Sequence, residues 1–407
     1  MNLDCDVAVV GAGPAGSRTA RNLAQRGFRV LLLEEHRTVG VPSHCSGLIS
    51  LRTLRESEIG KEAITHRVTG AFVHTQSGSE VALGGGETRA VAIDRVAWDR
   101  TLAEQAQAAG AELVRARVLN VARENSHVRL QTQTDGRDSA ITARLVVGAD
   151  GTHSRVRRTL GMGAPREYAY NLGIEGRLKT RRDDFVHVFV GREMAPGWFG
   201  WIIPTGDGMV RAGVGSTNGV KPIDCYRRLT QAFPELFEGI EPCRMYGGTI
   251  PLEFAPRSYG DNVLLAGDAA GQVKPFSGGG IYTSLVAGRH AAETAAKALE
   301  ADDVSARRLA AYEKGWKREI GRELVRSLRI RRFGLSLSED EVERVVRALR
   351  SDGMQSLATR YGDIDYPSRV LLRIARSAPA LAMLASVSLR KPAATWNLVR
   401  AHLPFAV

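Results

Sequence analysis

Apolar and polar positions in the first 35 residues predict a strand, a helix and a second strand in close succession. Residues 7–10 form a short apolar run typical of a buried strand, and the glycine-rich turn 11–16 follows directly. Small and apolar residues then recur at helical spacing until Gly27, where we expect the helix to end. The next apolar run, residues 30–33, stops at Glu34. This order predicts a β-α-β unit at the start of the chain.

The turn between the first strand and the helix has the composition needed to hold a dinucleotide. Gly11 allows a tight turn, Gly13 lets the backbone approach a pyrophosphate, and Gly16 lets the helix pack against the strand. Free N–H groups and a partial positive charge at the helix N-terminus favour a phosphate there. Glu34, about twenty residues further on, is placed to accept hydrogen bonds from a ribose. We therefore predict a dinucleotide site.

Two later strand ends repeat this combination of small residues and an acid. One apolar strand ends at Asp150-Gly151, and another ends at Gly267-Asp268. Glycines 278–280 then open a helix predicted over 282–299, whose bare N–H groups can stabilise an anion such as the reduced flavin ring. NAD would need only the first of these sites. Three separated sites indicate one extended cofactor that crosses the sheet.

The pattern changes to alternation between residues 165 and 257, which predicts an antiparallel sheet. Within it, Phe199, Trp201 and Ile203 fall on one face, and Pro204 follows. These side chains could wall an apolar ligand pocket or fill a core, and alternation alone favours the core. Beyond residue 303 the pattern is helical.

These patterns together predict an α/β protein, α+β overall, whose parts are interleaved along the chain. A Rossmann-like domain that binds this cofactor is expected over residues 1–164 and 257–300, and the family resemblance given below implies that it is an FAD-binding domain. An antiparallel-sheet substrate domain is expected over 165–256, and a helical C-terminal region over 301–407. We see no internal repeat or low-complexity linker.

Composition narrows the function classes. The chain has 407 residues, 43% of them hydrophobic and 25% charged, as in ordinary globular proteins. Its net charge of +12 suits anionic partners, but no nucleic-acid-binding module is visible. The four cysteines have neither metal-ligand spacing nor the pattern of a disulfide framework, and no apolar run reaches the roughly 18 residues of a membrane span. We expect a cytoplasmic protein without a metal site or a nucleic-acid partner.

Two segments outside the cofactor pattern carry candidate chemistry. The loop 36–50 leaves the carboxyl end of the second strand, where ligands of α/β sheets bind, so Cys45 and His44 are candidate reaction residues. The alternative for both is simple loop packing. Near the C-terminus, residues 369–389 are basic and amphipathic, then apolar. Such a helix can lie on a membrane surface or dock on the rest of the protein.

The combined motifs resemble a known family. The order GxGxxG, Asp-Gly, Gly-Asp resembles the FAD-binding fold of the p-hydroxybenzoate hydroxylase type over about the first 300 residues. The run 267–271, with the glycines at 278–280, resembles the geranylgeranyl reductase family, as does the loop 41–50 with its cysteine. The strand 199–204 is similar to that family's Tyr-x-Trp-x-Phe-Pro signature, with Phe199 for Tyr and Ile203 for Phe. The first replacement removes a phenol.

The resemblance implies FAD as cofactor and saturation of isolated C=C bonds in a geranylgeranyl or other prenyl chain. Cys45 and His44 become candidate catalytic residues, and Phe199, Trp201, Ile203 and Pro204 become candidate walls of the substrate pocket. NADPH or a ferredoxin-like carrier would supply electrons, and contact with the inner membrane surface would give access to the lipid. The residues expected to hold FAD are Gly11, Gly13, Pro14, Ala15, Gly16, Glu34, Glu35, Arg95, Asp150, Gly151, Gly267, Asp268, Gly278, Gly279, Gly280 and Ile281.

Other flavoprotein functions share parts of this pattern. A flavin-dependent monooxygenase or halogenase is the main alternative, because halogenases carry Trp-x-Trp-x-Ile-Pro and residues 201–204 match its second half. Phe199 stands where the first tryptophan belongs. An electron-transfer flavoprotein with a quinone partner normally adds an iron–sulfur segment, for which the sequence has no cysteine cluster. A non-enzymatic lipid- or flavin-binding module would need a redox-silent flavin.

Overall fold

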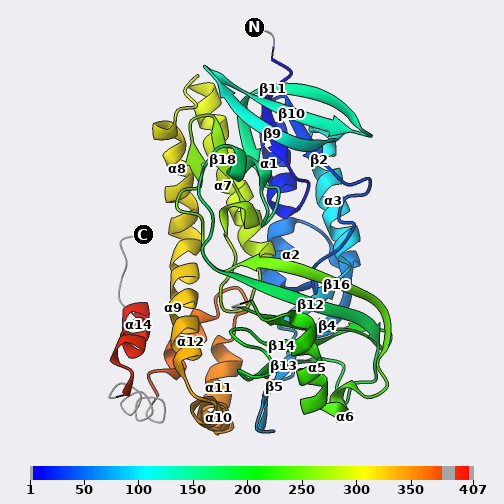
Figure 1. Ribbon diagram of the computed structural model, residues 1–407, viewed down its shortest axis with the longest axis vertical. Helices are drawn as coiled ribbons and strands as arrows, with labels where there is room; N and C mark the ends of the chain where they lie inside the picture. Colours follow the sequence, from blue (N-terminus) through cyan, green and yellow to red (C-terminus); the bar gives the residue numbers. More distant parts are fainter. Residues whose placement is uncertain (1–2, 218, 378–389, 403–407) are drawn as a thin grey trace.

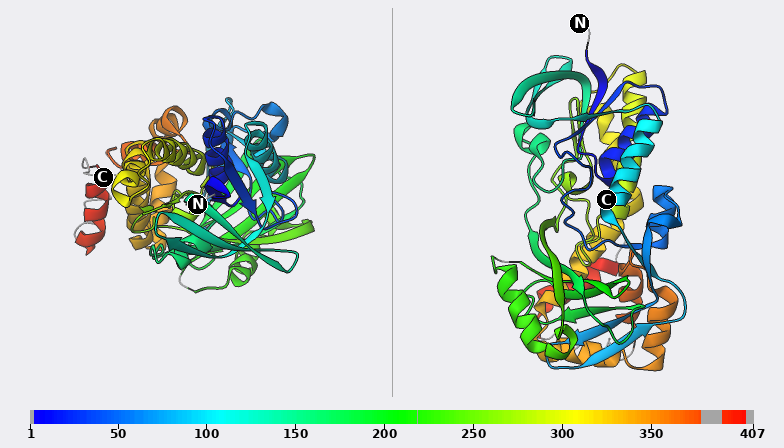
Figure 2. Two further views of the ribbon diagram at one scale, coloured as in Figure 1. Left: turned by 90° about the horizontal axis from the view of Figure 1, so that it is seen from above. Right: turned by 90° about the vertical axis from the view of Figure 1, so that its right-hand side faces the viewer.

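The computed structural model describes residues 3–217, 219–377 and 390–402. Two sheets lie one beyond the other along the long axis, and long helices run beside both of them (Figures 1 and 2). The α/β architecture predicted from the sequence is confirmed. No helix in the described ranges is both long and apolar enough to cross a membrane.

The first sheet contains the predicted β-α-β unit. Its strands run in the order β17-β18-β11-β1-β2-β8, and β1 is parallel to both of its neighbours, with Val7 opposite Leu145 and Val30. The apolar runs of β1 and β2 are buried on both faces, as parallel strands require. The apolar strand predicted to end before Asp150 is the last part of a longer strand, β11. The bounds are β1 Cys5–Val10, β2 Val30–Glu34, β8 Glu112–Arg115, β9 Arg117–Glu124, β10 His127–Thr134, β11 Arg137–Gly148, β17 Tyr259–Gly260 and β18 Val263–Leu265.

Helices α1 (Pro14–Ala24), α3 (Arg95–Ala108) and α7 (Ile281–Glu300) accompany this sheet. Alanine-rich faces let α1 and α7 approach closely, and a Cβ atom at Gly288 would lie only 2.5 Å from the Ala15 carbonyl oxygen. A hydrophobic core of Val7, Leu32, Leu145, Leu264 and the alanines of α7 fills the space between sheet and helices. This packing holds the N-termini of α1 and α7 near the carboxyl ends of the parallel strands.

The second sheet has seven strands in the order β16-β12-β15-β14-β13-β5-β6. Strands β5 and β6 come from the part of the chain predicted to bind FAD, and β5 pairs in parallel with β13. Residues before 165 therefore help to build this sheet. The predicted domain boundaries stay a prediction. One face is covered by α5 (Pro222–Ala232) and α6 (Pro234–Phe237). The strands are β5 Gly70–Thr75, β6 Glu80–Gly84, β12 Tyr168–Arg177, β13 Phe185–Val190, β14 Gly200–Gly206, β15 Met209–Ser216 and β16 Glu241–Pro251.

Two histidines are buried inside this second sheet. His74 of β5 and His187 of β13 stack with their ring centroids 5.1 Å apart, and His74 Nε2 lies 2.9 Å from His187 Nδ1. Phenylalanines 72, 189 and 233 surround them. Burial lowers the pKa of His74 to about 4 and that of His187 to about 3. Both rings are therefore neutral at physiological pH.

The C-terminal region is helical, as predicted. Its helices pass from the first sheet to the second along one side of the molecule (Figure 1). Glu343 of α10 accepts hydrogen bonds from the hydroxyls of Thr75, Ser77 and Ser79 at the β5–β6 turn, which ties this region to the second sheet. The predicted amphipathic helix over 369–389 is described only in part, because residues 378–389 lie outside the described ranges. The helices are α8 Ala306–Trp316, a π-helical turn Lys317–Gly321, α9 Arg322–Ser336, α10 Glu339–Ala348, α11 Asp352–Tyr361, α12 Ser368–Ile374 and α14 Pro392–His402.

Short elements connect the two sheets. Strands β3, β7 and β4 form a small antiparallel sheet, and α2 follows β3 directly. The loop that carries Cys45 ends where β3 begins, so this small sheet fixes one end of the loop. The bounds are β3 Leu48–Ser50, α2 Leu51–Ser57, a 3₁₀ turn Lys61–Ala63, β4 Ile64–Val68, β7 Ala90–Ile93, α4 Arg155–Thr159 and a 3₁₀ turn Gly267–Ala270.

Candidate active site

The first cofactor turn lies between β1 and α1, against the end of β11. Gly11 has a φ of 98°, and a Cβ atom there would lie 2.4 Å from the Ala149 carbonyl oxygen. A Cβ atom at Gly16 would lie 1.8 Å from the Gly11 carbonyl oxygen, whereas the space beside Gly13 is open to 4 Å. Pro14 stands in the first turn of α1. Two glycines are thus required by close packing, and the third leaves room for a pyrophosphate.

The two acids at the end of β2 contact protein groups. Glu34 Oε2 accepts a hydrogen bond of 2.9 Å from the Ala12 N–H, and Oε1 accepts one of 3.0 Å from the His36 N–H. Glu35 forms an ion pair with Arg117 at 3.4 Å. Glu34 therefore stabilises the glycine turn itself. A ribose contact from either acid stays a prediction.

Asp150 has one free oxygen at the end of β11. Its Oδ2 accepts hydrogen bonds from the backbone N–H groups of Arg155 at 2.6 Å and Val156 at 3.1 Å. Its Oδ1 is buried and has no hydrogen-bond partner in the structure. Burial raises the pKa of this carboxyl. A buried acceptor without a donor is costly, so this oxygen suits a hydroxyl or N–H of a bound cofactor.

Asp268 lies beside the N-terminus of α7. A Cβ atom at Gly280 would lie 3.2 Å from Asp268 Oδ1, and the Thr152 hydroxyl donates to Oδ2 at 3.4 Å. Burial raises the pKa of Asp268, although the nearby charge of Arg95 acts in the opposite direction. The second and third cofactor turns are therefore adjacent in space.

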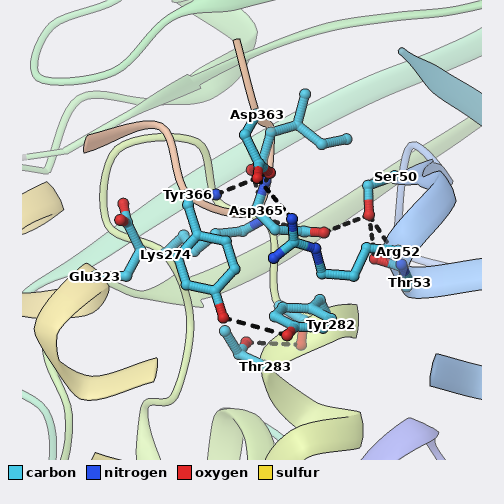
Figure 3. Close-up of polar contacts among 12 residues, drawn as sticks. Ser50, Arg52, Thr53, Lys274, Tyr282, Thr283, Glu323, Asp363, Asp365 and Tyr366 are labelled. Atoms are coloured by element: carbon cyan, nitrogen blue, oxygen red, sulfur yellow. Dashed lines mark hydrogen bonds and ion pairs between the residues drawn. The ribbon is translucent and has the colours of Figure 1, made fainter. Parts of the chain in front are cut away.

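A buried lysine supports the glycine turn at the start of α7 (Figure 3). Lys274 Nζ donates to Asp365 Oδ1 at 2.9 Å and to the Ile364 carbonyl oxygen at 2.7 Å, and the Ser50 hydroxyl donates to the other oxygen of Asp365. A Cβ atom at Gly279 would lie 2.9 Å from Lys274 Nζ. Side-chain exposure is 5% for Lys274 and 2% for Asp365. The C-terminal region thus completes the polar contacts behind this turn.

The cysteine loop is held on the second sheet by three charged side chains. Glu175 of β12 lies between Arg211 of β15, at 3.1 Å, and Arg244 of β16, at 3.0 Å. Arg244 donates to the Ser43 carbonyl oxygen at 2.9 Å, and Arg211 donates to the Ser46 carbonyl oxygen at 3.0 Å. We call Glu175, Arg211 and Arg244 the arginine clamp. It fixes the backbone on both sides of Cys45.

Arg95, at the start of α3, connects the cysteine loop with the cofactor turns. Its guanidinium donates to both oxygens of Asp99, at 2.8 and 3.1 Å. Burial lowers the pKa of Arg95, but the neighbouring Asp99 and Cys45 raise it more strongly, so the net shift is upward. Arg95 also lowers the pKa of Asp268. The structure therefore brings together Cys45, Arg95 and Asp268 at one place.

His44 is less favourably placed than Cys45. It is exposed, and its Cβ lies 3.6 Å from the position of a Cβ atom at Gly248 on the outer strand β16. Cys45 is half-buried, and its sulfur accepts a hydrogen bond of 3.4 Å from the Gly47 N–H. Of the two predicted reaction residues, Cys45 is the one on the side of Arg95.

Two aromatic residues approach each other across the second sheet. Tyr246, Gly173, Gly213 and Trp201 are paired in one row across β16, β12, β15 and β14, so their side-chain positions share a face. A Cβ atom at Gly173 would lie 2.2 Å from the Tyr246 ring, and one at Gly213 would lie 2.5 Å from the Trp201 ring. Both rings therefore lie over the glycines between them.

Of the predicted pocket residues, Phe199, Trp201 and Ile203 occupy the same face, whereas Pro204 alternates to the other face. The rings of Phe199 and Trp201 are 6.0 Å apart at 65°, and Ile203 and Trp201 belong to one apolar cluster with Val186. Phe199 is half-buried and Pro204 is buried. Phe199, Trp201 and Ile203 pack together as a core would, and they also form the apolar surroundings of the Tyr246–Trp201 row. Their contact with a substrate stays a prediction.

Comparison with known proteins identifies the family. The FAD binding domain model matches residues 4–326. The digeranylgeranylglycerophospholipid reductase of Methanothrix thermoacetophila is 31% identical, covering 91% of this chain and 96% of that protein. Digeranylgeranylglycerophospholipid reductase 2 of Methanopyrus kandleri is 32% identical, covering 91% and 97%. The chain belongs to the geranylgeranyl reductase family of FAD-binding proteins. The family resemblance predicted from the motifs is confirmed.

The fold of this family member agrees with a solved structure. A geranylgeranyl bacteriochlorophyll reductase-like protein from Thermoplasma acidophilum superposes with a TM-score of 0.83, covering 98% of this chain and 99% of that one, at 24% identity. FAD is therefore the cofactor, and the protein is an FAD-dependent oxidoreductase. The open space at Gly13 and the unpartnered oxygen of Asp150 fit that cofactor.

Several residues of the candidate site were not predicted from the sequence. Tyr246 and the arginine clamp lie on strands whose sequences contain no recognisable functional motif. Lys274 lies in a segment for which the sequence analysis considered only the glycines. Only the register of the second sheet and the path of the C-terminal region bring them to the site. The sequence shows that these residues are charged or aromatic, but it does not show which residues they contact in the folded protein.

Proposed function

We propose that this protein is an FAD-dependent reductase that saturates isolated C=C bonds in the prenyl chains of a lipid. The observation that carries this proposal is the match, over 91% of the chain, to two proteins named digeranylgeranylglycerophospholipid reductase. The meeting of Cys45 with Arg95 and Asp268 supports it, because a reaction residue then lies beside the cofactor turns. These relatives favour reduction over the monooxygenase or halogenase alternative.

In the proposed mechanism, the turn at Gly13 and the free oxygen of Asp150 would hold FAD, which in its reduced form would supply the hydride for one alkene carbon. The apolar face of Phe199, Trp201 and Ile203 holds the chain and excludes water. An unactivated alkene stabilises negative charge poorly, so a proton has to reach the second carbon as the hydride arrives. Cys45 is a candidate for that proton transfer, and His44, exposed at the sheet edge, is a weaker one.

The electron donor of the proposed reaction is external. The described strands and helices place one glycine-rich dinucleotide turn, at α1, which we assign to FAD. NADPH or a ferredoxin-like carrier would therefore react with the flavin transiently. Stopped-flow reduction of the bound flavin by each donor, without lipid, distinguishes the two.

We also propose that the reductase works on the cytoplasmic side, in peripheral contact with the inner membrane surface. Support comes from a hollow of about 200 Å³ between α9 and α12, lined by Leu372 and four arginines, Arg326, Arg369, Arg373 and Arg376. Clustered guanidinium groups attract anionic head groups. Charge reversal at Arg373 should reduce co-sedimentation with anionic vesicles and leave binding to neutral vesicles unchanged.

An anaerobic experiment tests the proposed reaction. The flavin is reduced with dithionite, geranylgeranylated phospholipid or geranylgeranyl diphosphate is added, and the flavin spectrum and lipid mass are followed. We expect the flavin to reoxidise while the lipid gains mass in steps of two hydrogens. A flavin that stays reduced with every prenyl lipid, and reoxidises with product formation only when oxygen enters, would instead establish the monooxygenase alternative.

A further inference from the structure

Two buried polar atoms without partners lie on the face of the second sheet that also carries the arginine clamp. Tyr246 Oη and Trp201 Nε1 both lack a hydrogen-bond partner by distance and angle in the structure. The two residues are only 8% and 9% exposed. A buried hydroxyl or indole N–H without a partner is costly, so two of them on neighbouring side chains call for an explanation. Their presence indicates a site that is completed by a ligand or used in a reaction.

The backbone is adapted to bring these two groups to the same place. Gly173 and Gly213 stand between Tyr246 and Trp201 in the cross-strand row, and a side chain at either glycine would overlap an aromatic ring. The two rings therefore lie inward over the sheet. Burial raises the pKa of Tyr246, and the nearby Trp201 N–H, which is outside hydrogen-bond geometry, acts more weakly in the opposite direction. A donor so placed stabilises a phenolate more than a phenol.

The same phenol is coupled to the cysteine loop and to the arginine clamp. Burial is the largest cause that raises the pKa of Tyr246, and negative charge at Cys45 is the second. The positive charge of Arg211 lowers the same pKa. Cys45 is in turn coupled to Arg95, which acts on Asp268 at the cofactor turns. Tyr246 therefore lies on the substrate side of a connected set of groups that begins at the cofactor.

We propose that Tyr246 is a catalytic residue that gives the proton to the alkene carbon that does not receive the hydride. The proposal rests on the prenyl reductase function and adds the proton source to it. The proposal also explains why Phe199 can replace the tyrosine of the family signature. Tyr246 of β16 supplies a phenol hydroxyl to the same face of the sheet.

The step balances in atoms and electrons. The π bond of the alkene breaks, one carbon accepts the hydride that reduced FAD supplies, and the other forms a C–H bond with the proton of Tyr246. The O–H bond breaks, and its electron pair stays on the phenolate next to Trp201 and Arg211. The flavin is oxidised by two electrons as the alkene is reduced, and the phenolate regains a proton from the Cys45 thiol or from water.

Tyr246→Phe tests this assignment, because it removes one oxygen and keeps the ring. We expect the rate of lipid-dependent flavin reoxidation to fall by about 100-fold or more, in the range of general acid catalysis. Dithionite reduction of the flavin should be unchanged. Affinity of the oxidised holoenzyme for geranylgeranylated phospholipid, followed by quenching of tryptophan fluorescence, should stay within about twofold of the wild type, since the hydroxyl acts on the proton rather than on binding.

Tyr226→Phe is the matched control. Tyr226 belongs to α5, which covers the other face of the same sheet, and it is partly buried against Phe237. This variant should keep the wild-type rate and affinity. Wild-type turnover by Tyr246→Phe, or a loss of lipid affinity in proportion to its loss of rate, overturns the proposal. Failure of the wild-type protein itself to reduce any prenyl lipid would instead reject the proposed function.

Discussion

The two ends of the molecule build their polar sites in different ways. At the cofactor end, the turn after β11 is held by contacts that are close in sequence, because Asp150 accepts from the N–H groups of Arg155 and Val156, five and six residues further on. At the substrate end, Glu175 is paired with Arg211 and Arg244, which are 36 and 69 residues away. A site of local contacts depends on turn geometry, whereas a site of distant contacts depends on the register of a whole sheet.

This difference predicts the most severe loss at the local site. Gly16→Ala places a Cβ atom 1.8 Å from the Gly11 carbonyl oxygen, and backbone on both sides cannot move far. We expect destabilisation of about 3 kcal/mol or more and loss of bound FAD. Gly13→Ala is the matched control, because the space there is open without cofactor. It should keep the denaturation midpoint of the apoprotein and still weaken FAD binding. Equal effects of both variants on the apoprotein would contradict this account.

Acid should weaken the substrate end before the cofactor end. His74 and His187 have pKa values of about 4 and 3, below the ordinary value of 6.5, so the unfolded chain binds their protons more readily than the folded protein. Stability therefore falls as pH drops below 6.5, by about 2 kcal/mol per histidine at pH 5. The raised pKa values of Asp150 and Asp268 act in the opposite sense, since the folded state binds those protons more tightly.

Hydrogen exchange in a pH series checks this prediction. Protection in β5 and β13 should decline from pH 6.5 to pH 4 more steeply than protection in β1 and β11. Replacing both histidines by phenylalanine, His74→Phe with His187→Phe, should flatten the pH dependence of the second sheet. An unchanged slope in this double variant would show that other groups cause the acid sensitivity.

A substitution in the arginine clamp should have a smaller effect, and this effect should be limited to the rate of the reaction. Glu175→Gln removes the charge that holds Arg211 and Arg244 while keeping the shape of the side chain. The loop carbonyls around Cys45 should then shift, and kcat should fall about 10- to 100-fold with little change in KM. Glu56→Gln is the control, because Glu56 also lies between two arginines, Arg18 at 3.8 Å and Arg289 at 3.1 Å, with similar side-chain exposure. Equal rate losses in both variants would assign the effect to general destabilisation.

The smallest effect is expected where neither kind of site is involved. Lys297 and Glu293 form an exposed ion pair of 2.8 Å within α7. Lys297→Ala should change the free energy of unfolding by no more than about 0.5 kcal/mol and leave kcat unchanged. Urea denaturation and the lipid assay measure both quantities, and a loss of activity here would mean that α7 transmits surface changes to the cofactor turn.

The same contrast accounts for what the sequence could and could not predict. Gly11 and Gly16 could be predicted because neighbours in the turn or in the adjoining strand require them, and Gly13 because it belongs to the same short motif. The place of β5 beside β13 was not readable, since parallel pairing of strands more than 100 residues apart leaves no local signal. Tyr246 illustrates the limit, because its sequence neighbours give no reason to expect Trp201 beside it.

The buried contact between Lys274 and Asp365 has a consequence for the order in which the protein matures. A ribosome completes the dinucleotide turn at α1 early, but Lys274 waits a further 91 residues for its carboxylate partner. Until Asp365 has been synthesised, a cation beside Gly279 has no partner at that position and favours water over burial. During synthesis, the turn at α1 that would bind the pyrophosphate is therefore complete long before the turn at α7 that would contact the flavin ring. Closure of the polar contacts behind the α7 turn therefore depends on a segment that is synthesised 91 residues after Lys274.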